Sequence, residues 1–424
     1  MALSVRAFAL ITAALCGLAA LSACSTSKEP TARQVLEGYR SVAEASYQAA
    51  LQGVIQLQAA TQALTEQPSA SHLEAARLAW KQARVAYSQT EALRFGNWFV
   101  DEWEVRVNAW PIDEGFLDYV STDYLASPTN PNAQANLIAA EQMRIGERSL
   151  SSRSLDEGLL EALHTLSDHE SNVATGFHAI EFFLWGQDLH RHGGGSGQRP
   201  WTDFALNAEQ CTDGPQAAPA RHCDRRRAAL QALLSLLRRE LEQMAVVWGP
   251  QAGSYGDRLA QGPPAEGLRR MLFGLSSLSA DELAGERLQV PLLSQAPEEE
   301  QDCFSDDTHN SVYFNALGIE NLYYGRMGSL QAPVRLADLA RVTDATLAAD
   351  IEQALERTRA AVGAIRQSGE QGQVFDMLIR PGNSQGAALI QAAIDALQTQ
   401  AQLFEALGQA LGLGSLNPAA PREG

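Results

Sequence analysis

Much of the chain repeats apolar side chains at intervals of three or four residues, which is the spacing of one face of an α-helix. The pattern is clearest between residues 33 and 66, where it drifts little along the segment. The apolar positions there are Val35, Tyr39, Val42, Tyr47, Leu51, Val54, Leu57 and Leu64. The spacing predicts a long amphipathic helix that ends before Pro68, because proline cannot continue a helix.

A second helix is predicted after this proline. Ser71 and Glu74 have the spacing of a capping box, in which two side chains satisfy the free N–H groups at a helix start. We expect this helix to run to about Arg94. Periodic segments further along the chain predict helices over residues 131–146, 155–191 (one or two helices), 224–248, 264–278, 280–288, 308–324, 336–366 and 384–411.

One loop-rich stretch divides this helical pattern. Residues 191–223 are rich in Gly, Pro and Ala and include the run GGGSG. Because Gly and Pro interrupt regular structure, we interpret this stretch as a connection between two units. The sequence therefore predicts an all-α fold of two helical-bundle domains, 31–190 and 224–412, packed side by side. Residues 413–424 are expected to form a frayed tail.

The first residues have the composition of an export signal. Arg6 precedes an apolar segment, residues 7–23, that ends in small side chains, as in a signal peptide. The run LSAC at residues 21–24 resembles a bacterial lipobox, which implies cleavage before Cys24 and lipid on its sulfur. An ordinary secretory peptide and an uncleaved transmembrane anchor are the alternatives.

A lipoprotein signal also predicts a location. Residues 1–23 would be removed, and residues 24–30 would form a short polar tether to the membrane. Ser25 after Cys24 resembles an outer-membrane sorting signal, so we expect an exported protein anchored to the periplasmic face of a bacterial outer membrane. The formal net charge of −18 argues against nucleic acid as a partner.

The cysteines predict one disulfide bond. An exported location permits disulfides, and Cys211 and Cys223 close a short loop, so we expect them to pair. Cys303 would then remain free, and the two other pairings of these three cysteines are the alternatives. The chain has no CxxC or CxxCH motif, so neither a cysteine zinc site nor covalent haem attachment is predicted.

The segment GFHAIEFFLWGQDL, residues 176–189, carries one histidine and one glutamate among apolar side chains. His178 and Glu181 are three residues apart, so on a helix they share one face and could bind one metal ion. They supply only part of a site, and the HExxH pattern of zinc peptidases is absent. A histidine and a glutamate that only hydrogen-bond within the core explain the pair about equally well.

Other polar residues could complete such a site. Glu91 lies in TEALRFG, Asp113 and Glu114 lie in WPIDEGFLDY, and Asp307 and His309 lie in QDCFSDDTH. The carboxylates also have structural explanations, because acidic side chains favour helix starts and can form ion pairs along a helix. His309 has no such explanation.

Together these segments resemble the imelysin-like family, also described as insulin-cleaving membrane proteases or iron-regulated proteins. Gly176, His178 and Glu181 stand at the positions of its GxHxxE motif. The resemblance covers most of residues 31–410 and includes RFGNWFVDEW, NAWPIDEGFLDY, RPWTDF, CFSDDTH and GIENLYYG. It implies two helical-bundle domains, an exported or lipid-anchored bacterial protein, an association with iron uptake and a classification as a metallopeptidase.

Three functions are therefore considered. The first is a lipoprotein that binds a metal ion or an iron-bearing ligand between the domains and acts with iron-uptake proteins, with iron favoured and zinc the alternative. Its candidate metal ligands are His178, Glu181, His309, Glu91, Asp113 and Asp307. The second is a metallopeptidase, in which Glu114 activates water on zinc held by His178, Glu181 and His309. The third is a scaffold, in which the aromatic residues of the motif segment only pack helices.

Overall fold

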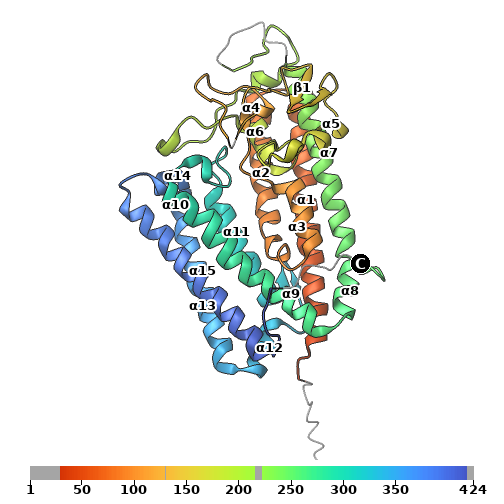
Figure 1. Cartoon of the computed structure of the whole chain (residues 1–424), viewed down its shortest axis with the longest axis vertical. Helices are drawn as coiled ribbons and strands as arrows, with labels where there is room; N and C mark the ends of the chain where they lie inside the picture. The colour runs from red at the N-terminus through yellow and green to blue at the C-terminus, as the bar shows by residue number, and fades with distance from the viewer. Residues whose placement is uncertain (1–28, 129, 215–221, 418–424) are drawn as a thin grey trace, which may run out of the picture.

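The computed structural model describes residues 29–128, 130–214 and 222–417. Two long helices, α1 (Ala32–Glu66) and α2 (Ala70–Ser88), pack against each other at the start of the chain (Figure 1). The apolar positions predicted for α1 are all buried, so the long amphipathic helix is confirmed. A capping box formed by Thr31 and Gln34 begins it.

The ends of α2 differ from the prediction. Ser69, and not Ser71, is the N-cap, because its side chain accepts the hydrogen bond that begins the helix. The helix ends at Ser88 and not near Arg94. The backbone hydrogen bonds then change to a three-residue spacing, which forms the 3₁₀ turn η1 (Glu91–Leu93).

The chain then crosses one end of the helices as a mostly irregular connection. Its first regular elements are α3 (Trp98–Asn108), α4 (Glu114–Leu117), and the antiparallel strands β1 (Gln142–Ile145) and β2 (Arg148–Ser151). The helix predicted over 131–146 is wrong. The backbone N–H groups of residues 136–138 donate to the carbonyl groups of residues 115–117, so they cannot take part in a local helix.

The connection continues through the predicted linker. Its elements are α5 (Glu157–Leu163), η2 (Leu166–Asp168), α6 (Gly176–Trp185), η3 (Arg191–Gly193) and η4 (Trp201–Phe204). The described part of residues 191–223 packs closely, since Arg199 and Asp203 are buried. Cys211 and Cys223 form the expected disulfide bond, and Cys303 is free as predicted.

The remaining chain is almost entirely helical. Its elements are α7 (Cys223–Val247), α8 (Tyr255–Gln261), α9 (Pro264–Ser277), the π-helical η5 (Leu278–Gln289), α10 (Val290–Ser294), η6 (Pro297–Glu299), α11 (Thr308–Tyr323), β3 (Arg326–Met327), β4 (Leu330–Gln331), α12 (Leu336–Thr343), α13 (Ala345–Glu370), α14 (Phe375–Ile379) and α15 (Ser384–Ala410). The helix predicted over 336–366 is broken at Asp344, whose carboxylate accepts backbone N–H groups and so starts α13.

The long helices lie in two groups side by side (Figure 1). One contains α1, α2 and α7, and the other contains α11, α13, α15 and η5. Although α7 was predicted in the second unit, it packs against α1 and α6. α11 contacts both α2 and α13, and one hydrophobic cluster extends through both groups. The all-α fold is confirmed, while the division into domains 31–190 and 224–412 stays a prediction.

The predicted export features lie largely outside the described residues. These features are the signal peptide 1–23, the lipidated Cys24, and the tether up to residue 28. The last residues of the predicted tail, 418–424, also lie outside. Within the described ranges, no helix is both long enough and apolar enough to cross a membrane.

A buried charge cluster fixes the connection against α7. Arg226 on α7 donates to the two carboxylate oxygens of Asp118 at 2.7 and 3.0 Å, and Arg199 donates to the same carboxylate at 2.7 Å. The three side chains are 0–1% exposed. Burial opposes the ionisation of Asp118, but Arg226 and Arg199 hold its pKa below the usual value. Two buried guanidinium groups thus share one carboxylate, although Arg199 also pairs with Asp203 at 3.0 Å and Arg226 with Asp213 at 2.7 Å.

Replacing this carboxylate should destabilise the fold. Asp118→Asn is expected to lower the free energy of unfolding by about 3–5 kcal/mol, because two buried arginines lose their shared counter-charge. Urea unfolding measures the change. Asp123→Asn removes the same charge from an exposed position of the same segment, and should change stability little. Equal losses in the two variants would contradict the role given to Asp118.

His164, directly after α5, has contacts that suit only a neutral ring. Its Nε2 lies 2.9 Å from the carbonyl oxygen of Val105, and its Nδ1 accepts the backbone N–H of Ala174 at 3.2 Å. Burial lowers the pKa of His164 to about 4, which is below the value of about 6.5 for an unfolded chain. The unfolded chain therefore takes up a proton at a higher pH than the folded one.

This difference predicts a loss of stability in mild acid. The contribution of His164 is complete above about pH 6.5 and declines as the pH falls toward 4. His164→Gln should therefore lose less stability than the wild type between pH 7 and pH 5, as measured by urea unfolding. His169→Gln, at an exposed position nearby, should keep the wild-type dependence. Parallel profiles for all three proteins would rule the explanation out.

Candidate metal centre

α6 places the motif histidine and glutamate inside the protein. All of its residues are buried, and Trp80 of α2 donates to the backbone oxygen of Phe177 at 3.0 Å. Gly176 begins the helix with a φ of +87°, and a Cβ at this position would lie 2.6 Å from the backbone of Val107. Glycine at this position therefore lets α6 approach the end of α3 closely.

His178 and Glu181 contact each other directly, as the helical spacing predicts. Nδ1 of His178 lies 2.9 Å from Oε2 of Glu181, and the two side chains are 1% and 0% exposed. The other carboxylate oxygen, Oε1, accepts hydrogen bonds from the backbone N and the hydroxyl of Ser305 at 2.9 and 2.7 Å. Nε2 of His178 has no hydrogen-bond partner among the described residues.

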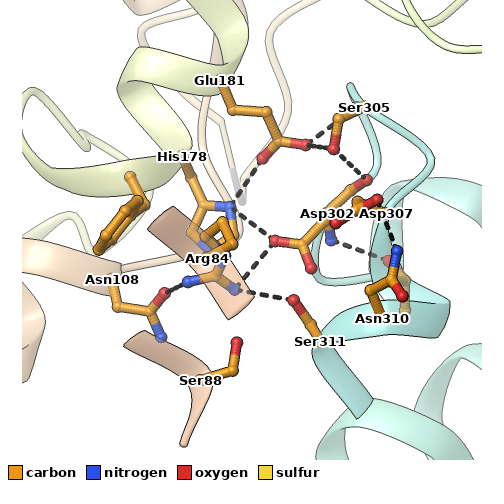
Figure 2. Close-up of polar contacts among 12 residues, drawn as sticks. Arg84, Ser88, Asn108, His178, Glu181, Asp302, Ser305, Asp307, Asn310 and Ser311 are labelled. Atoms are coloured by element: carbon orange, nitrogen blue, oxygen red, sulfur yellow. Dashed lines mark hydrogen bonds and ion pairs between the residues drawn. The ribbon is translucent and has the colours of Figure 1, made fainter. Parts of the chain in front are cut away.

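Asp302 joins this pair from the loop before α11. Its Oδ1 lies 3.8 Å from Nδ1 of His178 and 2.9 Å from Nη2 of Arg84. Figure 2 shows dashed lines that join Asp302 to both the histidine and the arginine. The ligand atoms of His178, Glu181 and Asp302 lie within 4.8 Å of one another, and all three residues are buried. We refer to these three residues as the His178 cluster.

Arg84 is a fixed positive charge on α2 beside the cluster. It donates to Oδ1 of Asn108 at 2.5 Å and to the hydroxyl of Ser311 at 3.3 Å, and its side chain is 2% exposed. Three aromatic rings lie 5.3–5.7 Å from its guanidinium carbon, those of Trp80, Tyr87 and Phe177. Their faces help to stabilise a cation that is shielded from water.

Burial and Arg84 set the protonation of the His178 cluster. Burial lowers the pKa of His178 to about 3, and Arg84 acts in the same direction, so the ring is neutral. Burial raises the pKa of Glu181 well above its usual value, and the charge of Asp302 raises it further. Burial also opposes the ionisation of Asp302, but Arg84 holds its pKa below the usual value. A neutral imidazole and two carboxyl groups are suitable ligands for a divalent transition metal.

A pocket of about 390 Å³ borders the cluster at His178. Its wall also includes Glu114 from α4, Cys303, and the acidic run of residues 298–300. Burial raises the pKa of Glu114 to about 7. The pocket therefore offers space beside His178, together with a carboxyl group that can exchange a proton near neutral pH.

Two predicted ligands are engaged in ion pairs outside the His178 cluster. Glu91 pairs with Arg287 of η5 at 2.7 Å, and both side chains are buried. Asp307 pairs with Lys81 of α2 at 3.1 Å and accepts a hydrogen bond from Asn310. Neither residue belongs to the metal-ligating groups found among the described residues.

His309 and Asp113 also stay apart from this cluster. Nε2 of His309 lies 3.3 Å from the side-chain nitrogen of Asn310, and the ring lies against Gly369 of α13. Asp113 precedes α4, where its Oδ1 accepts the hydroxyl of Tyr124 at 3.1 Å. Of the predicted ligands, the structure therefore brings only His178 and Glu181 together.

Three residues of the site were not predicted from the sequence. Asp302 and Ser305 lie in QDCFSDDTH, where the helix start next to Asp307 and His309 gives the stronger sequence signal. Arg84 carried a usable signal: it stands four residues after Trp80 and three before Tyr87, on the buried face of α2. A charge on an apolar face predicts a buried counter-charge.

Comparisons with known proteins agree with this architecture. Residues 43–404 match the imelysin family, Peptidase_M75. Over 99 residues the chain is 36% identical to iron-regulated protein A of Synechococcus elongatus, a match that spans 23% of this chain and 28% of that protein. The chain therefore covers about a quarter of this relative's length.

Two solved structures share the fold. One, assigned as an iron-regulated protein A precursor from Parabacteroides distasonis, has a TM-score of 0.63 at 14% identity and covers 91% of this chain and 97% of its own. The other, an imelysin-like protein from Psychrobacter arcticum, has a TM-score of 0.51 at 16% identity, with coverages of 88% and 94%. Since the family match extends over most of the sequence, the chain belongs to the imelysin family.

Proposed function

We propose that this protein binds a metal ion, with iron favoured over zinc, through His178, Glu181 and Asp302. The observation that carries the proposal is the convergence of one imidazole nitrogen and two carboxylate oxygens within 4.8 Å in a buried cluster. Mixed nitrogen and oxygen donors suit Fe²⁺ and Zn²⁺. The name of the Synechococcus elongatus relative, iron-regulated protein A, supports iron.

The surroundings of the cluster fit a metal ligand set. Ser305 orients one oxygen of Glu181, and Arg84 orients Asp302, as residues around a metal site commonly do. His178 is neutral, so one of its ring nitrogens has a free lone pair. Its Nε2 is buried and has no hydrogen-bond partner among the described residues, which is energetically unfavourable. A ligand in the adjoining pocket that bonded to this nitrogen would remove the penalty.

The charge of Arg84 favours an ion that arrives with an anionic ligand. With a metal in place of the Glu181 proton, two carboxylates and one arginine carry a net charge of −1, so a divalent cation would make the buried site positive. An anionic group on an iron-bearing ligand would offset this charge. The pocket of about 390 Å³ beside His178 offers room for such a group.

The proposed location follows from the N-terminal sequence. Lipid on Cys24 would hold the protein at the membrane, with the periplasmic face of the outer membrane favoured. An exported metal-binding protein of this kind would deliver iron to, or receive it from, iron-uptake proteins. A fully non-catalytic scaffold is the alternative if no metal binds.

Ligand variants test the metal proposal. After loading with Fe²⁺ or Zn²⁺ and removal of excess metal, elemental analysis should find bound metal in the wild type. His178→Ala and Glu181→Gln should weaken binding by about tenfold or more, because each removes one donor of the cluster. Circular dichroism checks that the variants remain folded.

His309→Ala is the matched control, since this histidine lies outside the His178 cluster. It should retain the metal of the wild type. Equal metal content in the wild type, His178→Ala and Glu181→Gln would contradict the proposal, and little metal in all of them would favour the scaffold. A loss of metal in His309→Ala as well as in His178→Ala and Glu181→Gln would instead support the ligand set that was predicted from the sequence.

Glu114 favours a metallopeptidase as the second candidate function. It lines the same pocket as His178, and its pKa of about 7 suits a general base at neutral pH. Glu114→Gln should then abolish cleavage of an unfolded protein substrate without changing the metal content. Glu298→Gln, an exposed acid at the same pocket, should leave cleavage intact. Metal binding without cleavage in the wild type would exclude this alternative.

A further inference from the structure

Three aspartates from distant segments meet at a second place in the fold. Asp188 follows α6, Asp306 lies in the loop before α11, and Asp376 lies in α14. One carboxylate oxygen from each lies within 4.8 Å of the other two. We propose that Asp188, Asp306 and Asp376 form a second metal site that binds one hard divalent cation of about the size of Ca²⁺. The proposal is independent of the function proposed for the His178 cluster.

The backbone holds these carboxylates in place on one side. The N–H groups of His190, Gly195 and Met377 donate to Asp188 at 2.8 Å, to Asp306 at 2.8 Å and to Asp376 at 2.6 Å. Each bond engages one oxygen of its carboxylate. The three acidic groups are therefore oriented by short segments of main chain, whose positions do not depend on flexible side chains.

Two of the opposite oxygens, those of Asp306 and Asp376, lack partners although they are buried. Oδ1 of Asp306 and Oδ2 of Asp376 form no hydrogen bond within the described part of the chain, and Asp376 is 0% exposed. Among the described residues, the ion pair that involves one of the three aspartates joins Asp188 to the imidazole of His190, at 2.9 Å. Buried carboxylate oxygens without partners are costly unless a cation or another donor reaches them.

A fourth carboxyl group, that of Glu300, gives independent support. Its side chain is 2% exposed, and its Oε2 has no hydrogen-bond partner among the described residues. Glu300 lies in the same loop as Asp306, so this loop holds a further buried carboxyl oxygen that the described residues leave without a donor.

The donor set and its spacing indicate the type of cation. All the candidate ligand atoms are carboxylate oxygens, which hard cations prefer, whereas the His178 cluster includes a nitrogen. Ca–O bonds are about 2.3–2.6 Å long, so two oxygens on opposite sides of one Ca²⁺ lie about 4.6–5.2 Å apart. The aspartate oxygens, all within 4.8 Å of one another, can therefore share such an ion without large rearrangement.

The glycine run of the predicted linker forms part of this arrangement. Gly194 has a φ of +71°, and a Cβ there would lie 2.5 Å from the sulfur of Met377. The run GGGSG thus packs against α14 and presents the N–H of Gly195 to Asp306. A bound cation would tie α14 to the ends of α6 and α11.

Calcium titration of the mature chain tests the proposal. Isothermal titration should detect Ca²⁺ binding, and thermal unfolding should show a Tm that rises with Ca²⁺ and returns to its starting value with a chelator. Asp306→Asn and Asp376→Asn should weaken binding by about tenfold or more. Asparagine tolerates the positive φ of residue 306, so neither substitution strains the backbone.

Two controls separate binding from structure. Asp350→Asn removes an exposed charge from α13 and should keep the Ca²⁺ response. Without Ca²⁺, Asp376→Asn should be at least as stable as the wild type, because it removes repulsion between acids. A loss of stability in that condition would instead show a structural role for Asp376 and overturn the proposal.

The Ca²⁺ experiment can also be distinguished from the test of metal binding at the His178 cluster. His178→Ala should retain the Ca²⁺ response of the wild type, because the imidazole is not part of the aspartate site. Loss of that response in His178→Ala would show that the two clusters form one site, and would contradict a separate one. Absence of any Ca²⁺ response in the wild type would overturn the proposal and leave the His178 cluster untouched.

Discussion

The buried ion pair between Arg84 and Asp302 holds the loop before α11 against α2, and the arrangement of the His178 cluster depends on this contact. Arg84 belongs to α2, and Asp302 lies in the loop before α11, so the pair joins the two groups of helices. Asp302 stays ionised next to Glu181 because the arginine balances its charge. Arg84 stays buried because it has aromatic neighbours and Asn108 as an acceptor. Removing either partner would leave a charge without compensation inside the protein.

The loop that contains Asp302 is rich in acidic residues. The segment from residue 298 to residue 307 contributes acids to the His178 cluster, to the wall of its pocket and to the aspartate group. Burial raises the pKa of Glu181 and of Glu300, and the charges of neighbouring aspartates raise it further. The net charge of −18 is thus more than a property of the surface, since part of it is confined where cations would be attracted strongly.

The all-α fold could be predicted because local periodicity determines it, as α1 and the contact between His178 and Glu181 show. The helix predicted over 131–146 does not form, because backbone N–H groups in this segment donate to the carbonyl groups of residues 115–117. A local sequence pattern does not reveal such long-range hydrogen bonds. The same limit applies to the site. Glu91 and Asp307 looked like ligands, but Arg287 and Lys81 neutralise them, and those partners are remote in sequence. Asp302 could be identified as a site residue only as the counter-charge of the buried Arg84.

Gly176 shows that the GxHxxE motif determines how closely α6 packs against α3, as well as which polar side chains α6 carries. The glycine lets α6 approach the backbone of Val107 closely. This close approach sets the position of His178 relative to the rest of the site. A larger side chain there would move His178 without altering any ligand. The glycine of GxHxxE therefore sets a spacing. A homologue without it could keep both polar residues and still fail to align them with an acid in another segment of the chain.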